Sequence, residues 1–188
     1  MLITTSRKPS KRTRSFCQYL NRVFISEYTN RGKMSMRDVL LKAANLGYSY
    51  VAVVFEYNGN PSKITFFNSE GSEILSMTIN VALPEKRINI QKEDLSFKCD
   101  LEEMAILGDI LQLKTLDDFE SDESDKYGLD FEDFQESNLI TIKNSKSDDF
   151  KYNDSKQDYK AIIDVFDKKG ICTGFKIFIK NFKLEDSA

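Results

Sequence analysis

The densest group of chemically active side chains lies within the first fifteen residues. The run from Thr4 to Ser15 joins five cations to a series of serine and threonine hydroxyls, with Pro9 stiffening the path. Arginine offers a planar fork of donors for phosphate oxygens, and lysine offers a mobile point charge. Hydroxyls and the free N–H groups of a helix start add neutral donors. This combination predicts binding to the phosphate backbone of a polyanion.

A second basic cluster, Asn30 to Arg37, has the same design, with cations and a glycine directly before a helix. Two such loops entering two helices of one sheet are expected to line a single groove. The candidate RNA-binding residues are Arg7, Lys8, Lys11, Arg12, Arg14, Arg31, Lys33 and Arg37. Tyr19 and Tyr28 are candidates for stacking on unpaired bases. Phe16 belongs to an apolar stripe, so we expect it in the core.

The charge is sorted along the chain, although the net charge of the whole is only −3. Residues 1–42 hold ten lysine and arginine residues against two acids, a net charge of +8. Residues 100–136 hold fourteen acids against two lysines, a net charge of −12. Such sorting points to a polyanion-binding surface on one part of the molecule, which the overall charge hides.

The composition argues against several classes of enzyme. There is no histidine, which removes Ser-His-Asp and Cys-His nucleophile systems and histidine-containing zinc sites. The segment from Arg31 to Met34 is no P-loop, because Glu27 stands where a glycine is required and Met34 replaces the magnesium-binding hydroxyl. A calcium loop starting at Glu123 would have Phe134 at its twelfth position, where a carboxylate is needed. We therefore expect a non-enzymatic protein without cofactor or metal, and a phosphoryl-transfer enzyme stays a weaker alternative.

The first half of the chain shows an alternation of strand and helix patterns. Ser35 and Asp38 form a capping-box pattern, and Gly47 can end the helix that follows. Asn58-Gly59-Asn60-Pro61 is a strong turn signal. We expect strands at 2–5, 25–28, 48–55, 63–68 and 73–81, with helices at 13–24 and 36–46, and a loop at 6–11.

The second half is less regular. Asp100 and Glu103 could cap a helix reaching Leu111, and the acidic residues 116–136 suggest a loop. Strands are expected at 139–143, 158–166 and 171–182, with a turn at Asp167 to Gly170. The predicted fold class is therefore α/β, with two small halves that are each a mixed sheet with packed helices. We place the basic groove in residues 1–85 and the acidic segment 100–136 in residues 86–188.

The basic clusters also carry a family resemblance. The run from Ile3 to Ser15 and the later Asn30-Arg31-Gly32-Lys33 resemble the signature of Brix-domain ribosome-biogenesis proteins, in particular the archaeal single-domain members. The match covers roughly residues 1–46. It implies two halves related to the anticodon-binding fold of class II aminoacyl-tRNA synthetases, and RNA-contacting roles for Arg7, Lys8, Arg12, Arg14, Arg31 and Lys33. The acidic segment 100–136 departs from the family's pattern.

The resemblance implies binding to precursor ribosomal RNA, with the small-subunit precursor as the expected partner alongside other assembly proteins. The alternative is a protein-interaction module whose basic head docks an acidic partner, or the chain's own acidic segment. The N-terminus lacks the pattern of a secretory signal, and no stretch is apolar enough to span a membrane. The three scattered cysteines suggest reduced, buried or half-buried thiols. We therefore expect a cytoplasmic location and no small-molecule substrate.

Overall fold

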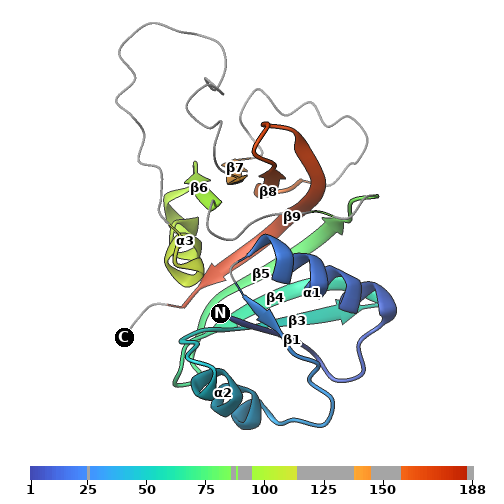
Figure 1. Cartoon of the computed structure of the whole chain (residues 1–188), viewed down its shortest axis with the longest axis vertical. Helices are drawn as coiled ribbons and strands as arrows, with labels where there is room; N and C mark the ends of the chain where they lie inside the picture. The colour runs from blue at the N-terminus through green and yellow to red at the C-terminus, as the bar shows by residue number, and fades with distance from the viewer. Residues whose placement is uncertain (25, 86–87, 89–94, 114–137, 145–157, 186–188) are drawn as a thin grey trace, which may run out of the picture.

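The computed structural model describes residues 1–24, 26–85, 88, 95–113, 138–144 and 158–185. The strands in these residues form one nine-stranded mixed sheet in the order β2-β1-β3-β4-β5-β9-β8-β7-β6 (Figure 1). The strands are β1 (Leu2–Thr5), β2 (Glu27–Tyr28), β3 (Val51–Tyr57), β4 (Asn60–Phe67), β5 (Glu73–Ala82), β6 (Leu95–Cys99), β7 (Asn138–Asn144), β8 (Ala161–Phe166) and β9 (Cys172–Leu184).

The two longer helices lie on opposite faces of the first half of the sheet. Helix α1 (Lys11–Val23) shares a core with Ile3 and Val54, whereas α2 (Met36–Asn45) shares one with Leu2 and Val53. Successive strand residues point to opposite faces, so these two sets cannot lie on the same side. The 3-10 helix η2 (Glu102–Met104) and helix α3 (Ile106–Leu111) contribute Met104, Leu107 and Ile110 to the α1 core.

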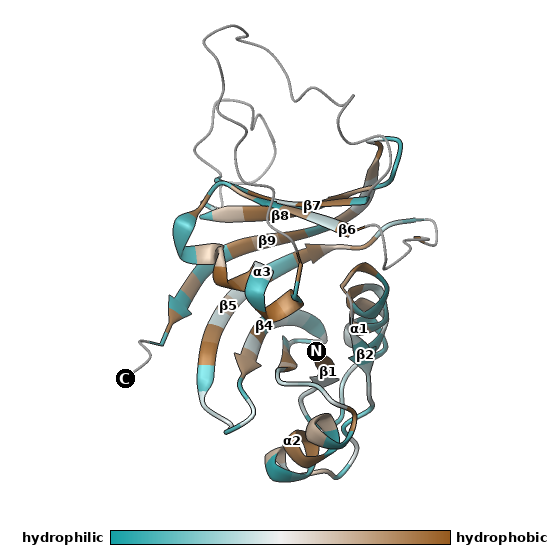
Figure 2. Ribbon diagram, turned by 60° about the vertical axis from the view of Figure 1, so that its left-hand side comes forward, coloured by the Kyte–Doolittle hydropathy of each residue, from teal (hydrophilic) through white to brown (hydrophobic). Residues whose placement is uncertain are grey.

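Helix α1 packs both on the first strands of the chain and on its last strand, β9. Its buried face carries Phe16, Cys17 and Leu20 at helical spacing. The ring of Phe16 stacks on Phe175 of β9, with centroids 5.8 Å apart. Burial raises the pKa of the Cys17 thiol to about 12, so this cysteine is a core residue. The hydrophobic stretches along helices and strands meet in this interior (Figure 2).

The α/β class is confirmed, but the two expected sheets are continuous. Strand β5 pairs antiparallel with β9 from Leu75–Leu184 to Ala82–Lys176, which joins both sets of strands by backbone hydrogen bonds. A pattern of alternating apolar residues cannot reveal this joint, because the paired strands are about a hundred residues apart in the chain. The division at residue 85 and the likeness to the anticodon-binding fold stay predictions.

Two expected helices and one expected cysteine environment need correction, and one strand was not predicted. Helix α1 begins at Lys11, not Thr13, because Ser10 is the residue that caps it. The expected helix from 100 to 111 is two short pieces, and neither Asp100 nor Glu103 caps it: Leu101 precedes η2 without a side-chain cap bond. Strand β6 is an element that the sequence pattern does not predict. Cys172 is exposed, since it lies at the start of β9 beside the turn.

The remaining predicted elements agree within a few residues at their ends. The turn at Asp167 to Gly170 is present, with the Gly170 N–H donating to the Asp167 carbonyl at 2.9 Å. Most of the acidic segment 100–136, from residue 114 onward, lies outside the described part of the chain. None of the described helices combines the length and apolarity that crossing a bilayer requires.

Candidate nucleic-acid interface

Three parallel strands end at the same edge of the sheet, and the predicted basic loops follow two of them. Leu2 of β1 lies opposite both Glu27 of β2 and Val51 of β3. The chain leaves β1 toward α1 on one face and leaves β2 toward α2 on the other. In open α/β sheets, the point where neighbouring connections diverge to opposite faces forms a crevice that binds ligands. We call this edge, with loops 6–10 and 29–35 and the first turns of α1 and α2, the basic edge.

The first loop is held at both of its ends. The Ser6 N–H donates to the Val54 carbonyl at 2.8 Å, and the Ser10 N–H donates to the Glu56 carboxylate at 2.8 Å. The Ser10 hydroxyl donates to the Gly59 carbonyl at 2.8 Å. Lys8, between these anchors, has a left-handed backbone with φ of 54°. The anchors therefore present Arg7 and Lys8 to solvent on a fixed backbone.

The start of α1 is unusual in its charges. Its first turn holds Lys11, Arg12 and Arg14 and no acid, although the positive end of a helix disfavours cations. Glu56 of β3 supplies an anion there, because its carboxylate accepts hydrogen bonds from the Thr13 hydroxyl at 2.6 Å and from Ser10. These hydrogen bonds lower the pKa of Glu56. The carboxylate thus stays ionised and holds the helix start against β3.

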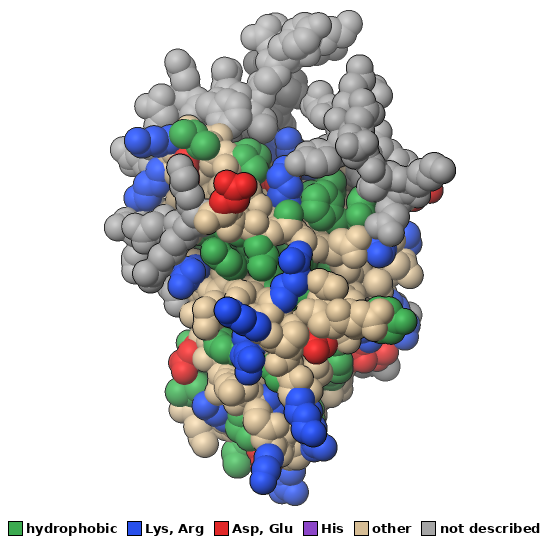
Figure 3. Space-filling view, turned by 90° about the vertical axis from the view of Figure 1, so that its right-hand side faces the viewer, with side chains coloured by type: hydrophobic (Ala, Val, Ile, Leu, Met, Phe, Trp, Pro, Cys, Tyr) green, Lys and Arg blue, Asp and Glu red, His purple; other side chains and the backbone are tan. Residues whose placement is uncertain are grey.

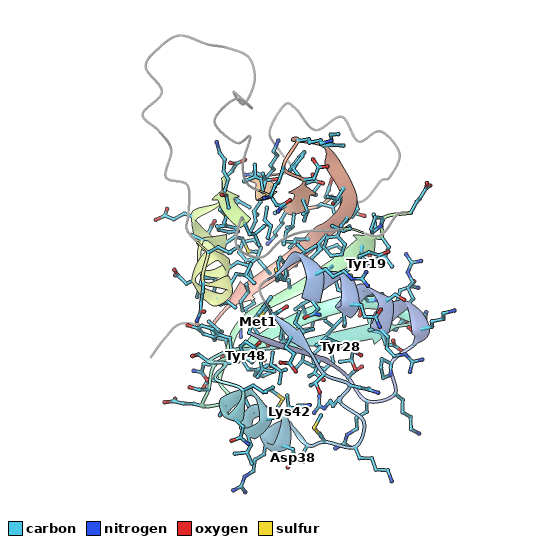
Figure 4. The ribbon with its side chains drawn as sticks, viewed as in Figure 1. Met1, Tyr19, Tyr28, Asp38, Lys42 and Tyr48 are labelled. Carbon is cyan, nitrogen blue, oxygen red and sulfur yellow. The ribbon has the colours of Figure 1, made fainter. Side chains whose placement is uncertain are left out.

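The second loop is tied to the sheet and to α2. Thr4 donates its hydroxyl to the Thr29 carbonyl at 2.9 Å, and the Lys42 ammonium donates to the Thr29 hydroxyl at 2.6 Å. Figure 4 shows Lys42 on the side of α2 that faces the sheet. The Arg31 guanidinium donates to the Met34 carbonyl at 3.3 Å and so closes the loop on itself. The predicted capping box of Ser35 then begins α2.

The two loops bring like charges together. Partial burial and the neighbouring Arg7 charge both lower the pKa of Arg31, which means that the two guanidiniums repel each other. Within the described residues, the ion pairs join Lys63 to Glu73, Lys176 to Asp164 and Lys183 to Glu185, and none includes a residue of the basic edge. In the view of Figure 3, lysine and arginine side chains lie over the lower half of the molecule and also in its upper half. An anion bound here would relieve the repulsion.

Comparison with known proteins decides the family. No protein-family model matches the chain. A probable Brix domain-containing ribosomal biogenesis protein of Methanothermobacter thermautotrophicus, however, is 33% identical over 186 residues, which are 98% of this chain and 99% of the relative. The chain belongs to the Brix domain-containing ribosomal biogenesis proteins. A second member, from Methanococcoides burtonii, is 42% identical over 85 residues, 45% of this chain and 53% of its own length.

Solved structures agree with this assignment. The crystal structure of Mil, an archaeal Imp4-like protein, superimposes on this Brix-domain protein with a TM-score of 0.67 at 31% identity, covering 98% of this chain and 100% of Mil. A probable ribosomal biogenesis protein from Aeropyrum pernix shares the fold, with a TM-score of 0.59 at 18% identity and coverage of 99% and 96%.

The predicted site residues of the Brix-domain protein divide into three groups by position. Arg7 and Lys8 lie in the first loop, and Arg31 and Lys33 lie in the second. Lys11, Arg12 and Arg14 are exposed on the first turn of α1, although the sequence predicts a loop at Lys11. Arg37 is exposed on the first turn of α2. The charge of Arg7 contributes to the lowered pKa of Arg31 in the other loop, and RNA binding by any of the eight stays a prediction.

The aromatic side chains that were candidates for base stacking are buried or half-buried. Phe16 is fully buried, as predicted for a core residue. Tyr19 is half-buried, with its ring 6.1 Å from Phe175 and with Arg22 5.5 Å above it. Tyr28 on β2 is also half-buried, and burial raises the pKa of its hydroxyl. Figure 4 labels Tyr19 at α1 and Tyr28 below that helix.

Sequence reasoning missed the residues that hold the basic loops. Glu56 is separated from Ser10 by 46 positions, and Lys42 is separated from Thr29 by 13. A single acid near the end of an apolar strand has no local pattern that would mark it as an anchor. Among the described residues, no group of three or more cysteine or acidic side chains is placed to hold a metal ion, so we assign no ligands.

Proposed function

We propose that this protein binds precursor ribosomal RNA through the basic edge and assists its folding or processing without catalysing a reaction. The relatives are named as ribosomal biogenesis proteins, and Mil is described as Imp4-like. The small-subunit precursor is the RNA that we would test first. We propose assembly proteins as further partners and the cytoplasm as the location of this protein.

The placement of the two basic loops at the same ends of neighbouring parallel strands carries this proposal. Loop 6–10 follows β1 and loop 29–35 follows its parallel neighbour β2, and the charge of Arg7 contributes to the lowered pKa of Arg31. Arginine pairs bind phosphate oxygens bidentately, and each phosphate contact releases counterions from the RNA. The exposed Arg7 and the half-buried Arg31 on these two loops are therefore suited to bind a sugar-phosphate backbone.

The test is fluorescence anisotropy with ribosomal RNA fragments and a double-stranded DNA control across a salt titration. We expect preferential binding to RNA, with the logarithm of the binding constant falling linearly with the logarithm of salt concentration. The double variant Arg7→Ala/Arg31→Ala should weaken binding to all RNAs similarly. The magnitude of the slope should fall by about 0.7 for each phosphate of a single-stranded RNA that the variant no longer neutralises.

A matched control removes two exposed cations from the other half, Lys169→Ala/Lys183→Ala. This variant should keep most of the affinity of the original protein. Equal losses of affinity in both double variants would mean that only total charge matters and that the basic edge is not the site. If the folded protein binds no RNA at all, a protein partner for the basic head becomes the better explanation.

A further inference from the structure

One exposed aromatic ring lies beside the basic edge. Among the described residues, the large apolar side chains left in solvent are Leu41, Leu46, Tyr57 and Ile171. Tyr57 is the aromatic one, and 73% of it is exposed. It is the last residue of β3, so it stands at the same edge where β1 and β2 end.

The backbone that carries Tyr57 ends in a tight hairpin turn. Tyr57 pairs with Asn60 across the two-residue turn Asn58-Gly59, whose φ angles of 49° and 76° are both positive. Such turns favour Asn-Gly and match the twist of the strands that they join. A tyrosine loses little conformational entropy when it makes contact, because its ring has only two side-chain torsions. The ring is thus an exposed surface that can make contact at a low cost in conformational entropy.

The last residue of the first basic loop is hydrogen-bonded to residues that precede and follow Tyr57 in the sequence. Ser10 is hydrogen-bonded to Glu56, directly before Tyr57, and to Gly59, two residues after it. Glu56 points toward the start of α1, and the next side chain along a strand points to the opposite side. Tyr57 therefore stands clear of α1, while Arg7 and Lys8 are fixed between the anchors at Val54 and Glu56.

We propose that Tyr57 is a stacking platform for an unpaired base of the RNA whose phosphates bind the basic edge. The inference rests on the proposed function and adds the class of RNA: a strand with accessible bases, not a continuous duplex. Every base has a flat π face, so stacking on an aromatic ring tolerates sequence differences. In a duplex the bases already stack on each other, and protein contacts there fall on phosphates and 2′-hydroxyls.

The experiment compares full-length original protein with Tyr57→Ala, Tyr57→Phe and the control Ile171→Ala, which also removes an exposed apolar side chain. The probes are a fluorescein-labelled unpaired oligoribonucleotide, the same strand in a duplex, and the same strand with abasic ribose positions. We expect Tyr57→Ala to weaken binding to the unpaired strand about 5- to 150-fold, the range for loss of one stacked base. Tyr57→Phe, which keeps the ring, and Ile171→Ala should bind like the original protein.

Two further readouts separate stacking from charge. The salt slope of Tyr57→Ala should be unchanged, since no cation is removed, whereas Arg7→Ala/Arg31→Ala lowers it. Duplex and abasic strands should bind the original protein and Tyr57→Ala equally. Tyr57→Trp introduces the sole tryptophan of the chain, and its fluorescence should be quenched by the unpaired strand but not by the abasic one.

The outcomes distinguish this inference from the proposed function. Unchanged binding of the unpaired strand by Tyr57→Ala, together with weakened binding by the arginine variant, overturns the stacking platform and leaves the basic edge in place. Equal loss of affinity on paired, abasic and unpaired strands also overturns it, because the ring would then act without a base. Failure of the original protein to bind any of the RNAs overturns both proposals.

Discussion

Ser10 and Glu56 show how single side chains can shape an entire surface. Ser10 accepts a hydrogen bond from the Thr13 N–H and so caps α1, while its own N–H donates to Glu56. Lys11 and Arg12 follow directly, and their positive charges are unfavourable at the positive end of a helix. One carboxylate from β3 therefore offsets the cations that the predicted site requires.

Glu56 leads to a prediction about pH. Its pKa is lowered in the folded protein by hydrogen bonds from Thr13 and Ser10, so its ionised form stabilises the fold above the unfolded pKa of about 4.3. That contribution is lost as the pH falls through the lower, folded pKa. The difference in free energy of unfolding between the original protein and Glu56→Gln should shrink from about pH 5 toward pH 3.

Urea unfolding at several pH values, followed by circular dichroism, measures this difference. Subtracting the two proteins at each pH removes the contributions of all other carboxylates. A difference that is constant across the range would show that ionisation of Glu56 is not linked to folding.

At the level of the secondary-structure elements, the two helices start in different ways. Helix α2 is capped by its own neighbours, because the Ser35 hydroxyl accepts from the Asp38 N–H and the Asp38 carboxylate accepts from the Ser35 N–H. Helix α1 depends in addition on Glu56, from a distant strand. The first arrangement is visible as a sequence pattern, and the second requires the folded sheet.

The capping box of α2 can be tested by Ser35→Ala. Loss of the cap should lower the free energy of unfolding by about 1 kcal/mol, the usual cost of removing a serine N-cap. The second basic loop ends at this cap, so amide exchange in residues 31–36 should also become faster. Ser69→Ala, in the exposed turn between β4 and β5, is the matched control and should leave the free energy of unfolding unchanged. An unaltered unfolding midpoint in Ser35→Ala would mean that α2 starts without help from its cap.

Across the entire protein, the halves share a sheet and a core. The β5–β9 pairing extends over most of β5, and Phe175 of β9 contacts both Phe16 and Tyr19 of α1. A surface built on β1, β2 and β3 is thus supported by a strand from the far end of the chain. Unfolding of one half is expected to expose apolar surface of the other.

Phe175→Ala tests this coupling. Emptying a fully buried aromatic site should cost about 3–5 kcal/mol of stability. Hydrogen–deuterium exchange should then become faster in β3 as well as in β8, with Ile171→Ala as the control that changes neither. Faster exchange confined to β7, β8 and β9 would show instead that the two halves unfold independently.

Features that depend on neighbouring residues could be predicted from the amino-acid sequence. The basic clusters, the capping box of Ser35, the Asn58-Gly59 turn and the apolar stripe of α1 all result from spacings within a few positions. These local signals were enough for the α/β class, for most strands and for the identity of the candidate RNA-binding cations. They also carried the resemblance to the Brix-domain proteins, which the relative from Methanothermobacter thermautotrophicus confirms.

How those parts meet could be learned only from the folded chain. Several features link residues far apart in the sequence: the effect of the Arg7 charge on Arg31, the anchoring of Ser10 by Glu56, the exposure of Tyr57 beside the first basic loop, and the β5–β9 pairing. Local patterns encode which face of an element is apolar, but they do not encode which other element will cover it. That choice depends on the packing of the whole core and on strand pairing, whose free energy arises only when distant segments come together.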